Sequence, residues 1–208
     1  MVDYLKIAQL QAQPEAPKRK IPDDYLMEVA NGMAQWGYQF TEESAKALVA
    51  YFSNKSLLFI GKDRACGSLF FKALSEFGQE VGTSRRREFQ FAVVFPTLAS
   101  LVSTERLRRF LSSHREVELV IDGIDEETPK TLLSTVLEFR RCSAKRTHFI
   151  VTGQPDCKVM EMIGGFSHDL EMFNINRDYT NDTTGSRSLT NTFYYSILGL
   201  WTGKEIED

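Results

Sequence analysis

Cysteine, long apolar runs and leader-like segments are all scarce in this sequence, and each scarcity excludes a class of protein. The 208 residues include three cysteines, Cys66, Cys142 and Cys157, which are far apart and odd in number. They give neither a disulfide framework nor paired metal-ligand spacing, so we expect a reducing, intracellular compartment, either cytoplasmic or nuclear. No apolar run approaches the ~20 residues of a membrane span. The N-terminus lacks the cationic start and apolar core of a signal peptide.

Positive charge is not in excess either. The formal net charge is -3, which argues against a general nucleic-acid coat but leaves a local basic patch open. The histidines at 114, 148 and 168 are isolated, and none pairs with a cysteine at ligand spacing, so metal catalysis has little support. What is present is ordinary for a globular protein, with 42% hydrophobic and 25% charged residues. This composition and length predict one domain, with or without a small appendage.

The chain divides into four segments by composition and hydrophobic pattern. Prolines and the basic run 18–20 interrupt the first segment, which we interpret as a flexible arm. Two amphipathic helices follow, one opening at Pro22 and the other capped by Thr41, and together they form a small helical preface. The predicted segments are the arm 1–21, the preface 22–55, a core 56–177, and a polar loop with a C-terminal helix over 178–208.

Within the core, apolar strands alternate with helices. The apolar runs are continuous rather than alternating, as expected for strands that are buried on both faces. The pattern predicts an α/β protein, a three-layer sandwich with a mainly parallel five-stranded sheet. The expected strands are 57–60, 89–95, 117–122, 148–152 and 170–175, and the expected helices are 68–79, 104–114, 128–139 and 158–163, the last closed by glycines 164 and 165.

The stretch 56–74, SLLFIGKDRACGSLFFKAL, reads as a strand, a glycine-bounded loop and a helix. This is the layout of a phosphate-binding loop with the pattern G-x-x-x-x-G-K-[ST]. Gly61 and Ser68 fit that pattern. Cys66 stands in place of the second glycine, and Gly67 stands in place of the lysine. Lys62 directly follows Gly61, and a rescue of the loop by this lysine remains open.

Two later strands end in polar groups. In VELVIDGIDE, four apolar residues run into Asp122, and Asp125 and Glu126 follow in the loop. Acids at this point can hold Mg²⁺ and polarise water, although Asp and Gly also mark ordinary turns after strands. In FIVTGQPD, Thr152 or Gln154 ends the next strand. Such a group can sense a γ-phosphate or simply lead into the turn at the following proline.

Taken in order, these pieces resemble the additional-strand P-loop ATPases, which include the AAA+ and NACHT/STAND groups. VIDGIDE resembles the Walker B motif of NACHT-like proteins, and the resemblance covers about residues 45–178. It implies that Asp122 and Ser68 hold Mg²⁺, and that Asp125 or Glu126 activates water. It also implies a nucleotide site with ATP and Mg²⁺ as ligands, formed by Gly61, Lys62, Gly67, Ser68 and Gln154.

The departures at Cys66 and Gly67 favour a domain that keeps this scaffold but has lost efficient phosphate binding. The sequence also offers neither a convincing arginine finger nor a full helical lid after residue 178. We therefore expect a pseudo-ATPase without a resident cofactor, which acts as a binding or scaffolding subunit of a larger assembly. Its partner is a protein, for which an ATPase subunit of the same assembly is one candidate. An active ATPase with an atypical loop is the alternative.

Basic residues suggest a third function, that of a nucleic-acid-binding accessory protein. Arg85, Arg86 and Arg87 precede the second strand, and a triplet in a loop can contact phosphates. The basic residues that end the third core helix are explained by the helix dipole alone. Cys66 in a loop before a helix is a candidate for a lowered thiol pKa, but no residue is nominated as its base.

Overall fold

The structure is a computed structural model, and it confirms an α/β fold with a parallel sheet. It describes residues 23–35, 37–62, 65–80, 89–141, 143–166, 169–175 and 198–200. Five strands run parallel: β1 (Ser56–Gly61), β2 (Phe91–Val94), β3 (Glu118–Ile124), β4 (Thr147–Thr152) and β5 (Leu170–Asn174). A sixth strand, β6 (Leu198–Leu200), pairs antiparallel with β2. The spatial order is β5-β1-β4-β3-β2-β6.

The strands form because their side chains are apolar on both faces, which suits a parallel sheet covered by helices. Every residue of β2 is buried, and β3 and β4 are buried over nearly their whole length. Strand β5 differs because it lies at the edge of the sheet, where only Phe173 is buried. The continuous apolar runs of the sequence therefore predicted the central strands correctly.

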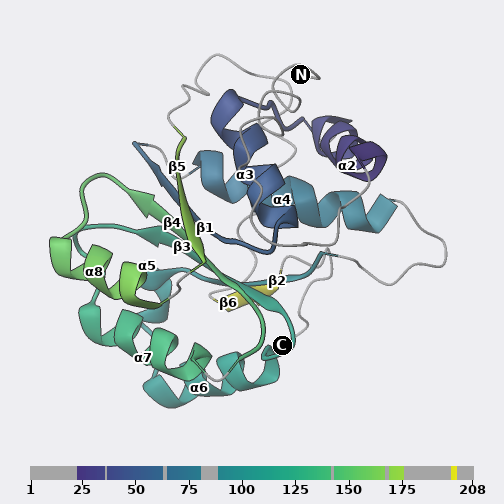
Figure 1. The fold of residues 1–208 in the computed structure, drawn as a ribbon. Helices are drawn as coiled ribbons and strands as arrows, with labels where there is room; N and C mark the ends of the chain where they lie inside the picture. The colour runs from purple at the N-terminus through teal and green to yellow at the C-terminus, as the bar shows by residue number, and fades with distance from the viewer. Residues whose placement is uncertain are drawn as a thin grey trace.

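Helices lie on both faces of the sheet (Figure 1). On one face are the preface helices α2 (Asp23–Gln35) and α3 (Glu42–Phe52), together with α4 (Ala65–Glu80). On the other are α5 (Pro96–Ala99), α6 (Thr104–Ser113), α7 (Lys130–Arg140) and α8 (Cys157–Phe166). Thr41 caps α3 as expected: its hydroxyl accepts a hydrogen bond from the Ser44 N–H at 3.2 Å.

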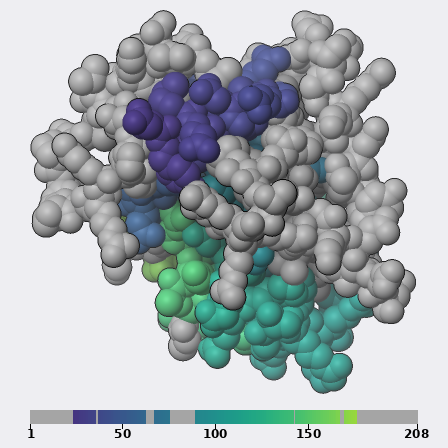
Figure 2. Space-filling view, turned by 90° about the vertical axis from the view of Figure 1, so that its right-hand side faces the viewer, coloured from purple at the N-terminus to yellow at the C-terminus, as the bar shows by residue number. Residues whose placement is uncertain are grey.

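The buried side chains form two clusters, separated by the sheet. The first joins the preface to the core, because Leu26 and Met33 of α2 belong to the same cluster as Phe59 of β1 and Phe70 of α4. The second cluster lies under α6, α7 and α8. The space-filling view shows the purple residues of α2 on the surface at one end and the teal residues of the α6–α7 region at the other (Figure 2).

Several expected boundaries were wrong. The expected helix at the C-terminal end is contradicted at residues 198–200, which form β6; the rest of that segment lies outside the described residues. Glycines 164 and 165 do not close α8, which continues through them to Phe166. The helix after β1 begins at Ala65 rather than Ser68. The short helix α5, which opens at Pro96, was not expected.

None of the helices in the described part of the chain has the length and apolar character that crossing a membrane requires. Positions 1–22, which hold the expected arm, lie outside the described residues.

Candidate functional site

The carboxyl ends of β1, β3 and β4 bring together most of the residues that the sequence nominated. Ligands of open α/β sheets bind at this edge. Gly61 at the end of β1 pairs in register with Thr152 at the end of β4. Beyond the pair, the Gly153 N–H donates to the Gly61 carbonyl at 3.1 Å, and the Thr152 hydroxyl donates to the Ile124 carbonyl at 3.4 Å. The three strand ends therefore form one connected surface.

Ser68 and Asp122 meet at the centre of this surface. The Ser68 hydroxyl donates to Asp122 Oδ2 at 2.6 Å, and both residues are buried. The residues come from the first turns of α4 and from β3, which are 54 positions apart in the sequence. This is the pair that the sequence assigned to Mg²⁺, and the structure brings the two side chains into contact.

A bulge in β3 follows Asp122. The register between β3 and β4 shifts between Asp122 and Ile124, and Gly123 has a φ of 89°. Only glycine adopts this backbone conformation without a steric cost. Asp122 and Ile124, on either side of the bulge, are both buried.

The loop between β1 and α4 is shorter than the sequence pattern predicted. Strand β1 ends at Gly61 and α4 already begins at Ala65, so only residues 62 to 64 connect them. In a phosphate-binding loop the backbone N–H groups of the loop cradle the phosphate. Here Ala65 and Cys66, which the pattern assigns to the loop, belong to the helix.

Gly67 lies where α4 approaches the sheet most closely. A Cβ atom at this position would lie 3.0 Å from Ile150 Cγ2 and 3.2 Å from Phe59 Cβ. Both neighbours are buried in the sheet below the helix. Glycine therefore suits the close helix–sheet packing here, and a larger side chain would require Ile150 or Phe59 to shift.

Asp125 opens α7 through a hydrogen-bonded turn. Its carboxylate Oδ1 accepts from the Thr128 hydroxyl at 2.9 Å and from the Glu127 N–H at 3.1 Å. The Thr128 hydroxyl in turn accepts from the Asp125 N–H at 2.9 Å. This arrangement commits Asp125 to the turn before α7. Glu126 is exposed and enters none of these hydrogen bonds.

Two further nominated residues stay at the surface. Gln154 is exposed after Gly153, and Lys62 is exposed after Gly61. The residues present do not supply the lysine of the nucleotide pattern, because position 67 is a glycine and a Cβ there would meet Ile150 and Phe59. Of the expected site, the Ser68–Asp122 pair is the contact that the structure shows directly.

A second polar cluster, which the sequence did not single out, lies at the opposite edge of the sheet. The Leu57 N–H donates to His148 Nδ1 at 3.0 Å. The hydrogen of the ring therefore sits on Nε2, 2.9 Å from Glu118 Oε2. The Arg146 guanidinium donates to Glu118 Oε1 at 2.7 Å and lies over the Tyr51 ring, 4.1 Å from its centroid.

The electrostatics of this cluster follow from burial and pairing. Burial alone would raise the pKa of Glu118, but the hydrogen bond from His148 and the charge of Arg146 outweigh it and lower the pKa to about 2. Burial lowers the pKa of His148, against the opposing influence of Glu118. The sequence contained one indication of this cluster, which is a histidine inside an apolar strand. A buried histidine needs hydrogen-bond partners, so polar neighbours could have been expected there.

The remaining nominated residues are not tested by the structure. Arg85, Arg86 and Arg87 lie outside the described residues, as does the His168 position. In the described part of the chain no group of three or more His, Cys, Asp or Glu side chains could hold a metal ion. No protein-family model matches the sequence, and no curated protein is significantly similar to it.

Proposed function

We propose that this chain is a degenerate P-loop ATPase domain of the additional-strand group, which acts as a binding or scaffolding subunit rather than as an efficient ATPase. The observation that carries the proposal is the combination at the start of α4. The Ser68–Asp122 contact is retained, whereas Gly67 is packed against Ile150 where the P-loop lysine would stand.

The sheet order supports the family half of the proposal. The loop-bearing strand β1 and the acid-tipped strand β3 are separated by β4, which is the extra strand that gives the additional-strand group its name. With helices on both faces, this arrangement is compatible with a P-loop-type three-layer sandwich (Figure 1). Other α/β proteins share this strand order and this arrangement of layers. The chemical support for the P-loop assignment therefore comes from the Ser68–Asp122 pair.

The shortened loop supports the loss of catalysis. A triphosphate in this fold is held mainly by loop N–H groups and a lysine, both aimed at the phosphates. Helix α4 begins at Ala65, so only residues 62–64 lie between it and β1, and position 67 carries a glycine instead of the lysine. The buried Asp122 carboxylate is held by the Ser68 hydroxyl, so a metal ion would need this contact to open.

A domain that keeps this fold without efficient catalysis can still bind a protein partner. The argument is an analogy with related domains that pair with active ATPases. Edge strand β5 offers one surface for a protein partner, because Met172 is 58% exposed on it. Most of the segment 178–208, where the sequence predicted a loop and a C-terminal helix, falls outside the described residues.

Calorimetric titration with ATP or ADP in the presence of Mg²⁺ tests the proposal. We expect affinities weaker than about 1 mM, no release of phosphate, and no difference between the natural protein and the variant Asp122→Asn. Micromolar affinity that Asp122→Asn abolishes would contradict the pseudo-ATPase assignment.

The variant Gly67→Lys sharpens this test. If the absent lysine were the sole defect, restoring it would restore nucleotide binding. We expect no restoration, because the lysine Cβ would displace Ile150 and the loop would stay short. If a folded Gly67→Lys protein bound nucleotide, the close packing of α4 would not be the cause of weak nucleotide binding in the natural protein.

An active ATPase with an atypical loop is the second candidate, and the Ser68–Asp122 contact favours it specifically. A hydroxyl and a carboxylate 2.6 Å apart at the carboxyl edge of the sheet could serve as Mg²⁺ ligands once a nucleotide brought the ion. The same titration separates the two candidates.

A further inference from the structure

A basic pocket of about 250 Å³ lies at the amino edge of the sheet, opposite the Ser68–Asp122 site. It is enclosed by the ends of α7 and α8 and by the starts of β1 and β4. Four cationic side chains and one carboxylate line it: Arg140, Arg141, Lys145, Arg146 and Asp169.

Among the residues that the structure describes, the positive charges lining this pocket outnumber the negative ones. Asp169 is already paired with Lys55 at 3.2 Å, and Arg146 is paired with Glu118. In the described part of the chain no ion pair includes Arg140, Arg141 or Lys145. The dipole of α7 supplies a charge of about −0.5 at its C-terminus, which offsets only a fraction of three cations.

Arg140 is the most unusual of these residues. It is 2% exposed, and its guanidinium donates only to backbone carbonyls, those of Val117 at 2.9 Å and of His114 and Arg146 at 3.4 Å. Its Nε atom has no hydrogen-bond partner among the described residues. Burial lowers the pKa of Arg140. A buried cation without a carboxylate partner is costly, and an anion in the adjoining pocket would offset that cost.

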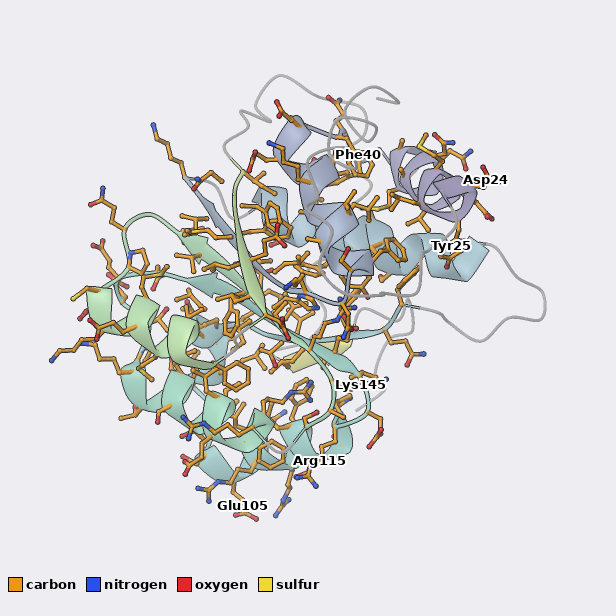
Figure 3. The ribbon with its side chains drawn as sticks, viewed as in Figure 1. Asp24, Tyr25, Phe40, Glu105, Arg115 and Lys145 are labelled. Atoms are coloured by element: carbon orange, nitrogen blue, oxygen red, sulfur yellow. The ribbon has the colours of Figure 1, made fainter. Side chains whose placement is uncertain are left out.

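A second buried polar group lies in the same wall. Thr147 begins β4, is 1% exposed, and its hydroxyl has no hydrogen-bond partner in the part of the chain that the structure describes. Figure 3 labels Lys145 in the lower half of the view, above Arg115. The Ser143 hydroxyl donates to the Arg115 carbonyl at 3.2 Å, which holds the loop before β4 in place.

We infer that this pocket binds a small phosphate-bearing anion, of the phosphate monoester class. A phosphate monoester carries a charge of about −1.5 to −2 near pH 7, which matches the uncompensated cations better than a monocarboxylate does. The volume admits one phosphate with a small organic group. A nucleic-acid strand would require an extended groove, and the net charge of the chain is -3.

Nuclear magnetic resonance on the ¹⁵N-labelled full-length protein tests this inference. Inorganic phosphate and glycerol phosphate are the probes, and acetate is the monoanionic control. We expect both phosphates to shift the backbone amides of residues 143–147 with a dissociation constant of about 1 mM or tighter, and acetate to cause no such shift. Added salt should weaken binding, because the interaction is mainly electrostatic.

Arg141→Gln and Lys145→Gln are the informative variants, because both residues are exposed and their replacement should leave the fold intact. Each should weaken phosphate binding about fivefold to tenfold. Arg108→Gln is the matched control, since this exposed arginine of α6 does not line the pocket. The variant Asp122→Asn should also bind phosphate normally, which keeps this test separate from that of the nucleotide site.

Three outcomes would overturn the inference. The first is the absence of amide shifts at residues 143–147 with 10 mM phosphate or glycerol phosphate. The second is equal binding of acetate, which would remove the argument for a dianion. The third is binding of a short single-stranded DNA that Lys145→Gln weakens, without binding of either small phosphate; this would assign the surface to nucleic acid instead.

Discussion

Gly67 is the residue at which the expected chemistry and the observed packing conflict. The sequence pattern assigns this position to a lysine that neutralises phosphate. In the structure the space for a side chain is occupied by Ile150 and by Phe59, which lie under α4. A glycine that looks like a lost catalytic residue in the sequence therefore has a packing role in the fold.

This role predicts opposite effects for two glycine replacements in helices. Alanine is favoured over glycine by about 1 kcal/mol in a helix. At Gly67 overpacking against Ile150 costs about 1–3 kcal/mol, so Gly67→Ala should destabilise the protein by about 1 kcal/mol. At Gly164 in α8 no atom lies within 4 Å of the added Cβ, so Gly164→Ala should stabilise by up to about 1 kcal/mol. Urea unfolding of both variants measures the difference. Equal effects at the two sites would show that α4 can move away from the sheet.

At the scale of elements, the turn that opens α7 decides what Asp125 does. The carboxylate that the sequence offered as a catalytic acid accepts hydrogen bonds from Thr128 and from the Glu127 N–H. Helix α7 itself begins at Lys130, after Pro129 at its N-cap position, which supplies no side-chain cap.

Replacements of Asp125 separate a structural role from a catalytic one. Asp125→Ala removes the acceptor and should cost about 1 kcal/mol of unfolding free energy, as for the loss of hydrogen bonds that hold a turn. Asp125→Asn keeps an acceptor oxygen and should cost less than half as much. Glu126→Gln, at an exposed position, should change stability by less than about 0.5 kcal/mol. Thermal or urea unfolding provides the measurement. If Asn were as harmful as Ala, the charge of Asp125 rather than its turn would be the important property.

At the scale of the whole molecule, the Glu118–His148–Arg146 cluster joins parts of the chain that are far apart. Arg146 donates to the carbonyls of Tyr51 and Lys55 at the end of α3, while His148 accepts from Leu57 of β1. The cluster therefore connects the helical preface to the amino edge of the sheet through hydrogen bonds.

The cluster predicts a loss of stability in acid. The pKa of Glu118 is about 2 in the folded protein and 4.5 ordinarily, so its contribution is complete above pH 4.5 and is lost as the pH falls toward 2. That shift corresponds to about 3 kcal/mol. The lowered pKa of His148 acts in the same direction, because the unfolded chain takes up its proton below pH 6.5 while the folded protein resists it.

Urea unfolding between pH 7 and pH 3 measures this effect, with Glu118→Gln as the comparison. The natural protein should be more stable than the variant at pH 7, and the difference should shrink as the pH falls below 4.5. A difference that stays constant over this range would mean that Glu118 titrates normally and that the cluster contributes through packing alone.

The sequence by itself determined the α/β class, the central strands and the caps, because these depend on local patterns of apolar and polar residues. The runs at 57–60, 117–122 and 148–152 became β1, β3 and β4, and Thr41 capped α3 as its position predicted. The same patterns placed Asp122 at the end of a strand, but β3 continues beyond it to Ile124.

Only the tertiary structure decided which residues meet across the sheet. Glycines 164 and 165 could close a helix or continue it, and the packing of α8 continues it. Residues 198–200 were predicted to be helical, but pairing with β2 makes them a strand, since long-range backbone hydrogen bonds override local propensity. The basic residues after α7 looked like a helix-dipole effect until the fold placed them around one pocket. Helix α4 packs closely on β1 and β4. This close packing brings Ser68 into contact with Asp122 and leaves little space for a side chain at Gly67. No local sequence pattern encodes the distance between a helix and a sheet.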